Sequence, residues 1–174
     1  DTTGSQYFAI NNMKLSDNSI VYLGGSAGSW SFDGFDAAID NYIYWDIIQE
    51  NPLTVCDTGH NEAGVRELID QIKSNSFRQL HMVWGMVGDK DSKTILSLLP
   101  KSAIYYFCAA SIPRAKDADA LKQEALKLGL AGKSYSSVEE AYQQAQKNTH
   151  ADDFIFVGGS TFVVADFLKS IDQI

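Results

Sequence analysis

Short apolar runs alternate with segments of helical periodicity over most of the chain, and this alternation constrains the fold more than any other feature. The runs lie at 53–56, 80–84, 103–108 and 154–157. Apolar residues then recur at helical spacing, as at Val65, Leu68, Ile69 and Ile72. Near-continuous apolar strands separated by helices are typical of a parallel sheet covered on both faces. The sequence therefore predicts an α/β fold with a doubly wound, mainly parallel sheet.

Capping residues mark where the predicted helices begin and end. Asn61 precedes the first helix, and the second ends before Pro100. The third spans about 117–128 and stops at Gly129, since glycine accepts the backbone conformation that ends a helix. A short strand is expected at 133–135. The last two helices are expected to begin at the capping-box pattern of Ser137 and at Ser160.

The first 43 residues have a different texture, being rich in Ser, Asn, Asp and Gly. Short strands are expected at 7–10, 20–23 and 30–32. We therefore predict two parts, a β-rich or irregular leader at 1–43 and an α/β domain at 44–174. The leader holds five of the 22 acidic residues and one of the 14 basic residues, so it carries half of the net charge of −8.

Charge and apolar patterning exclude several partners. A chain of 174 residues with a pI near 4.7 lacks the lysine and arginine clusters that bind nucleic acid or anionic membranes. No apolar stretch approaches 18 residues and no signal peptide is recognisable, so we expect a cytoplasmic protein. Cys56 and Cys108 lie inside apolar runs, as buried thiols do, and they lack metal-ligand spacing.

Polar residues follow four of the predicted strands. They occupy 57–61, 85–91, the loop with Ser111 and Arg114, and 158–161. Ligands of open parallel sheets bind outside the carboxyl ends of the strands. The candidate site is therefore expected at this edge, with no metal site of its own.

Each candidate residue has a functional and a structural interpretation. Asp57 could accept ribose hydroxyls and His60 could bind an anion or an amine, or Asp57 and Asn61 could simply cap the next helix. Ser160, after two glycines, could help cradle a carboxylate or phosphate, or only cap its helix. Arg114 could hold a carboxylate bidentately, or pair with the acidic stretch that follows it.

Other residues have simpler interpretations. His81 and the two tryptophans Trp45 and Trp84 are expected to be structural, His150 solvated, and Asp91 a helix cap. The chain has neither a P-loop nor the G-x-G-x-x-G fingerprint, which argues against a free-standing nucleotide-binding oxidoreductase.

Taken together, the motifs resemble the C-terminal domain of bacterial folylpolyglutamate synthase/dihydrofolate synthase, in the Mur ligase superfamily. The resemblance covers about residue 45 to the end. It is carried by the segments 50–52, 57–61 (D-T-G-H-N, similar to D-x-A-H-N), 84–86, 89–91, 113–115 and 158–165.

The resemblance implies part of an ATP-dependent amide ligase, in which a folate or pteroate carboxylate becomes an acyl phosphate that the amine of glutamate attacks. Asp57 and Asn61 would bind nucleotide, and His60, Ser160 and Arg114 would bind glutamate. ATP and magnesium would be held mainly by a preceding ATPase domain, so no catalytic residue is assigned here and the chain alone should be inactive. Where the family has a Gly-Arg pair before the aromatic residue at 45, this chain has Ile43 and Tyr44.

A second hypothesis comes from a different class. The chain could instead be a non-catalytic α/β module that binds a ligand or a protein partner, with the acidic leader serving interaction or packing.

Overall fold

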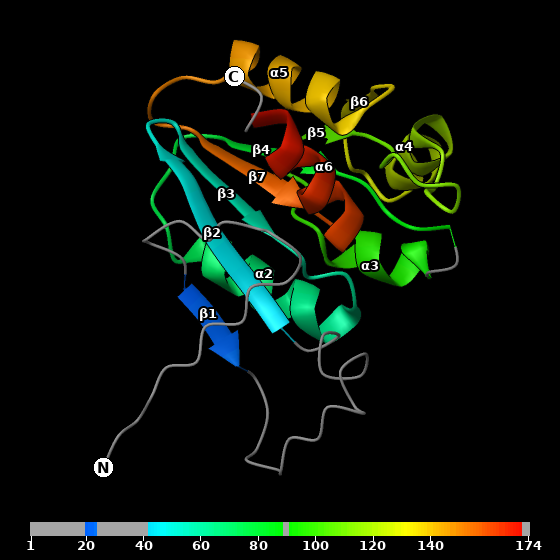
Figure 1. Ribbon diagram of the computed structural model, residues 1–174, viewed down its shortest axis with the longest axis horizontal. Coiled ribbons are helices and arrows are strands. Elements are labelled where there is room, and N and C mark those ends of the chain that lie inside the picture. Colours follow the sequence, from blue (N-terminus) through cyan, green and yellow to red (C-terminus); the bar gives the residue numbers. More distant parts are fainter. Residues whose placement is uncertain (1–19, 24–41, 89–90, 172–174) are drawn as a thin grey trace.

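The computed structural model describes residues 20–23, 42–88 and 91–171, and these form one seven-stranded mixed sheet (Figure 1). The strand order is β1-β2-β3-β7-β4-β5-β6. The strands are β1 (Ile20–Leu23), β2 (Tyr42–Glu50), β3 (Leu53–Asp57), β4 (Leu80–Trp84), β5 (Ile104–Phe107), β6 (Gly132–Ser134) and β7 (Phe154–Gly158).

The five strands from β3 to β6 in this order are parallel, as the sequence predicted. The last strand in the chain, β7, lies at the centre, between β3 and β4. Every residue of β4 and β7 is buried, which explains their near-continuous apolar character. The central position of β7 places the turn that follows it between the loops after β3 and β4.

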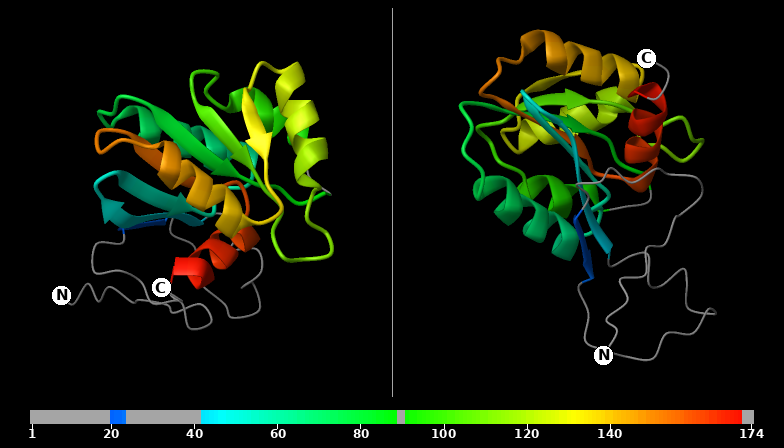
Figure 2. Two further views of the ribbon diagram at one scale, coloured as in Figure 1. Left: turned by 90° about the horizontal axis from the view of Figure 1, so that it is seen from above. Right: turned by 60° about the vertical axis from the view of Figure 1, so that its left-hand side comes forward.

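Helices cover both faces of the sheet (Figure 2). They are α2 (Glu62–Lys73), α3 (Ser92–Leu98), α4 (Ala118–Lys127), α5 (Val138–Asn148) and α6 (Thr161–Ile171). Side chains of Asn61, Asp91, Asp117 and Ser137 each accept a hydrogen bond from a backbone N–H in the first turn of the helix that follows. The predicted helices and the capping role of Asp91 are thereby confirmed.

Two hydrophobic clusters lie on opposite faces of the sheet. One joins α2, α3 and α4 to the face that carries Trp45 and Trp84, and the other joins α5 and α6 to the face that carries Cys56 and Cys108. Both cysteines are unpaired, and burial raises the pKa of each thiol well above its ordinary value. The structural interpretation of the tryptophans and cysteines is confirmed.

The start of the described chain departs from the expected pattern. The strand at 20–23 is confirmed as β1, whereas the strands expected at 7–10 and 30–32 lie outside the described residues. Nine residues, 42–50, form β2, which the sequence did not predict and which pairs antiparallel with both β1 and β3. The predicted division between residues 43 and 44 therefore falls within a strand.

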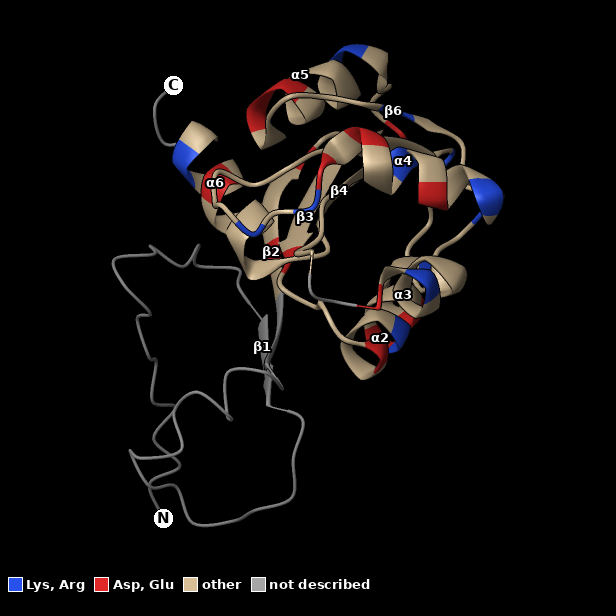
Figure 3. Ribbon diagram, turned by 90° about the vertical axis from the view of Figure 1, so that its right-hand side faces the viewer, with Lys and Arg blue, Asp and Glu red and all other residues tan. Residues whose placement is uncertain are grey.

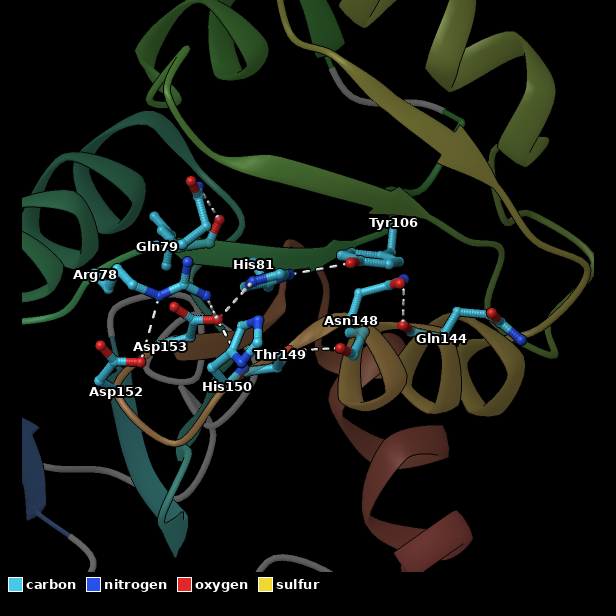
Figure 4. A network of polar contacts seen from close by, with 12 residues as sticks. Arg78, Gln79, His81, Tyr106, Gln144, Asn148, Thr149, His150, Asp152 and Asp153 are labelled. Carbon is cyan, nitrogen blue, oxygen red and sulfur yellow. Dashed lines mark hydrogen bonds and ion pairs between the residues drawn. The ribbon is translucent and has the colours of Figure 1, made fainter.

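A polar network lies at the amino-terminal edge of β4 and β7, opposite the predicted site (Figure 4). The buried carboxylate of Asp153 accepts a hydrogen bond of 2.8 Å from Arg78 and lies 3.4 Å from Nε2 of the buried His81. Nδ1 of His81 lies 3.0 Å from the hydroxyl of Tyr106. His81 therefore has the structural role expected of it, while His150 is exposed.

The surface shows no concentration of basic charge over the helices that Figure 3 displays. Acidic and basic positions are interspersed on α2 and α4, and α3 carries the single basic residue Lys93. Among the described residues, no helix is long and apolar enough to cross a bilayer.

Candidate functional site

Three loops meet at the carboxyl ends of β3, β7 and β4. In the register of the sheet, Gly158 of β7 lies between Asp57 of β3 and Trp84 of β4. The backbone N–H of Gly85 donates to the carbonyl oxygen of Gly158 over 3.2 Å, so the loop after β4 lies directly against the turn after β7. The clustering that the sequence predicted at this edge is thereby present.

The turn after β7 requires glycine at its second position. Gly159 has a φ of +89°, and a Cβ built on it would lie 2.6 Å from the carbonyl oxygen of Gly85. Residues with a side chain rarely adopt this backbone conformation, and the contact is shorter than real Cβ atoms make. The glycine therefore allows the chain to turn tightly against its neighbour and to begin α6 at this edge.

Ser160 occupies the position just before α6. It is 4% exposed, its Oγ accepts a hydrogen bond of 3.3 Å from the N–H of Phe162, and its carbonyl accepts one from Val164. The capping interpretation of this serine fits these contacts. The same geometry directs the amino end of α6 toward the shared edge, where its dipole favours a bound anion.

Asp57 is a buried carboxyl group with one unsatisfied oxygen. Its Oδ1 accepts a hydrogen bond of 2.6 Å from the N–H of Gly59, and its Oδ2 has no hydrogen-bond partner in the described residues. Burial raises the pKa of Asp57 to about 7, although the bond from Gly59 opposes the shift. A buried acceptor without a partner in the described residues suits a hydroxyl or amide donor.

His60 and Asn61 continue the same loop into α2. Nδ1 of His60 lies 2.9 Å from the carbonyl oxygen of Thr58. Because a carbonyl can only accept, Nδ1 is the donor of this hydrogen bond, so Nε2 is the only ring nitrogen that can act as an acceptor. Asn61 Oδ1 accepts a hydrogen bond of 2.8 Å from Gly64, so Asn61 caps α2 whatever else it contacts.

Arg114 lies on the exposed loop after β5 and reaches across to the start of α6. Its guanidinium carbon lies 5.0 Å from the centre of the Phe162 ring, a cation–π distance. Phe162 is two residues beyond Ser160, so this contact brings Arg114 beside the same helix end. Phe162 lies within the predicted motif at 158–165, but no local sequence pattern indicates that its ring contacts an arginine.

Within the described residues, no group of three His, Cys, Asp or Glu side chains is arranged to hold a metal ion. Two surface hollows of about 430 and 400 Å³ lie along α4, β6 and the start of α5. None of the five candidate residues lines either hollow. The candidate site is built from backbone turns, a helix end and a few polar side chains, of which Asp57 and Ser160 are buried.

Comparison with known proteins places this arrangement in context. The family described as "Mur ligase, glutamate ligase domain" matches residues 45–161. A dihydrofolate synthase/folylpolyglutamate synthase of Escherichia coli is 31% identical over 131 residues, which are 74% of this chain and 30% of that protein. A probable bifunctional folylpolyglutamate synthase/dihydropteroate synthase of Haloferax volcanii is 28% identical over 70% of this chain and 15% of its own length.

Solved structures match in fold as well. Escherichia coli FolC in complex with DHPP and ADP has a TM-score of 0.69 at 30% identity, covering 75% of this chain and 31% of that one. A bifunctional folylpolyglutamate synthase/dihydrofolate synthase with Mn, AMPPNP and L-glutamate bound has a TM-score of 0.67 at 26% identity, covering 73% and 30%. The chain thus spans less than a third of the length of each of these relatives.

Proposed function

The chain belongs to the glutamate ligase domain family of the Mur ligases, and we propose that it supplies the glutamate-binding part of an ATP-dependent amide ligase. The reaction is the addition of glutamate to dihydropteroate or folate in folate biosynthesis. The names of the similar enzymes from Escherichia coli and Haloferax volcanii support this substrate class. We expect the reaction to take place in the cytoplasm, where cysteines usually remain as unpaired thiols.

The observation that carries the proposal is the convergence of three βα loops on the turn at Gly158 and Gly159. Ser160 and the amino end of α6 would bind a carboxylate of glutamate, and Arg114 would bind the second carboxylate bidentately. Nε2 of His60 would accept a hydrogen bond from the amine of glutamate and so orient its lone pair. Placing an amine beside an activated carboxylate is mainly a problem of positioning, which groups fixed on neighbouring loops of one sheet edge can solve.

Asp57 and Asn61 are the proposed nucleotide contacts. The unpaired Oδ2 of Asp57 is an acceptor suited to a ribose hydroxyl, and Asn61 lies at the end of the same loop. Bound ATP would supply the phosphoryl group that activates the folate carboxylate. The described residues offer no ligand set for magnesium, so we assign the metal and the phosphates to an N-terminal ATPase domain. The isolated chain should therefore not turn over ATP.

Glutamate titration of the ¹⁵N-labelled chain tests this proposal. We expect amide shift changes at His60 and Ser160 with a dissociation constant no tighter than about 1 mM, because half of the site's walls come from another domain. Ser160→Ala should weaken binding. Ser137→Ala is the matched control, because it removes the same hydroxyl from the start of α5.

Two results would contradict the proposal. Shift changes confined to residues 1–43 would place the ligand elsewhere and would favour an interaction module. Equal weakening by Ser160→Ala and Ser137→Ala would mean that the α6 end has no special role.

A further inference from the structure

The loops after β4 and β5 are joined to each other by backbone hydrogen bonds. Val87 and Ala115 form an isolated antiparallel bridge. Gly88 N–H donates to the carbonyl of Arg114 over 2.9 Å, and Lys116 N–H donates to the carbonyl of Met86 over 2.8 Å. Residues 86–88 and 114–116 thus form a short two-stranded ribbon, here called the loop ribbon.

The loop ribbon continues directly into the candidate site. Gly85, just before it, is hydrogen-bonded to Gly158 and lies against Gly159. Arg114, within it, stacks on Phe162 at the start of α6. The position of the ribbon therefore decides where the guanidinium of Arg114 lies relative to the glycine turn.

Three side chains fasten the far end of the ribbon. Nζ of Lys116 lies 2.8 Å from Oε2 of Glu124 on α4 and donates to Oγ of Ser92 on α3 over 2.8 Å. Ser92 in turn donates to the same Oε2 over 2.6 Å. Each group therefore contacts the other two, and we call Lys116, Ser92 and Glu124 the lysine triad.

Two of the three members of the lysine triad are largely buried, and the side chain of Glu124 is 39% exposed. The side chain of Lys116 is only 15% exposed and Ser92 is 7% exposed, so an unpaired ammonium group would be poorly solvated there. Hydrogen bonds from Lys116 and Ser92 hold the pKa of Glu124 below its ordinary value. Removal of one partner should make the Lys116 side chain move toward water and should displace residues 114–116 of the loop ribbon.

We propose that Lys116, Ser92 and Glu124 are positioning residues that hold the loop ribbon in register with the glycine turn and so set the affinity for glutamate through Arg114. This inference rests on the proposed function for its glutamate step, but not for the holding of the ribbon. The three residues are separated by 24 and 32 positions in the chain.

The test compares Lys116→Met and Glu124→Gln with Lys122→Met in the 174-residue chain. Lys122 is the matched control, because it lies on the same helix as Glu124 and forms a second triad with Asp119 of α4 (2.7 Å) and Ser134 of β6 (3.0 Å), away from the ribbon. Hydrogen exchange is measured at the amides of Gly88 and Lys116, which close the ribbon, and glutamate affinity is measured by the same titration as above. Lys116→Arg, which keeps the charge and the donors, is the rescue variant.

We expect hydrogen exchange at both amides to become about tenfold faster in Lys116→Met and Glu124→Gln. This is the change in the opening equilibrium expected when one charge-assisted hydrogen bond is lost. Exchange should be unchanged in Lys122→Met and largely restored in Lys116→Arg. The dissociation constant for glutamate should rise at least threefold in the first two variants only. If a variant instead destabilised the whole fold, exchange would also become faster at the amides of the sheet, and this result would count against a specific effect on the ribbon.

Unchanged exchange at Gly88 and Lys116 in Lys116→Met would overturn the proposal. Faster exchange with an unchanged glutamate affinity would also overturn it, because the ribbon would then not position the site. If the unmodified chain bound no glutamate, the proposed function would fail, and the exchange data would still decide whether the triad holds the ribbon.

Discussion

Replacement of Asp57 by asparagine should change how the stability of the protein depends on pH. The pKa of Asp57 rises from 3.8 to about 7 on folding because the carboxyl group is buried. Between these values the native state keeps a proton that the unfolded state releases, so stability falls as pH rises. At 1.36 kcal/mol per pKa unit, the full penalty above pH 7 is roughly 4 kcal/mol.

Asparagine removes this penalty because it has no charge to bury. Its Oδ1 can still accept the hydrogen bond from Gly59, while its amide group leaves a buried donor in place of Oδ2. That donor costs about 1–3 kcal/mol at every pH. The stability of Asp57→Asn relative to the unmodified chain should therefore increase by up to roughly 4 kcal/mol between pH 4 and pH 8, on top of a constant offset.

Urea unfolding of both proteins at half-unit pH steps measures this difference. Asp91→Asn is the control with the opposite sign, because hydrogen bonds from Thr94 lower the pKa of Asp91 in the native state. Its relative stability should decrease as pH rises through 3.8. A stability difference for Asp57→Asn that is flat or decreasing with pH would refute the reasoning from burial.

Three further predictions concern the rest of the molecule. Asp153→Asn should lower the free energy of unfolding by about 2 kcal/mol or more, because it places a buried amide donor against Arg78. The control Asp152→Asn changes an exposed ion pair and should cost less than about 1 kcal/mol. Equal losses of stability in urea unfolding would contradict this prediction. Gly159→Ala should lower the melting temperature by at least several degrees through its positive φ and its backbone clash, and a wild-type value would contradict the geometry of the turn. Burial lowers the pKa of His81, so the native state resists its protonation and stability should fall as pH drops below 6.5; an NMR titration midpoint above 6.5 for this ring would be inconsistent with that burial.

Local patterns predicted most of the strands and helices of the α/β part. β4 was predicted with its observed ends, and the ends of β5, β6, β7 and α4 differ by only one residue. The caps at Asn61 and Asp91 were readable because a helix end needs a side-chain acceptor close in sequence. β2 was missed because its residues lie where the composition of the chain changes, which was interpreted as a domain boundary. Its antiparallel pairing with β1 on one side and β3 on the other is visible only in the structure.

The candidate site was predictable in outline and not in its supports. Parallel strands bring the loops at their carboxyl ends to one edge, so Asp57, His60 and Ser160 could be grouped from the chain order alone. The contact of Arg114 with Phe162 depends on how α6 leaves the sheet, and no spacing in the sequence records it.

The sequence by itself determined that the chain forms alternating strands and helices, where its helices are capped, and which polar residues share one edge, because these properties depend on neighbours within a few positions. Tertiary structure decided that β7 enters the sheet between β3 and β4 and that Lys116 meets Ser92 and Glu124. It also decided that one oxygen of Asp57 is buried with no partner among the residues that the structure describes. These outcomes depend on the close packing of segments far apart in the chain, and both burial and charge pairing are properties of that packing.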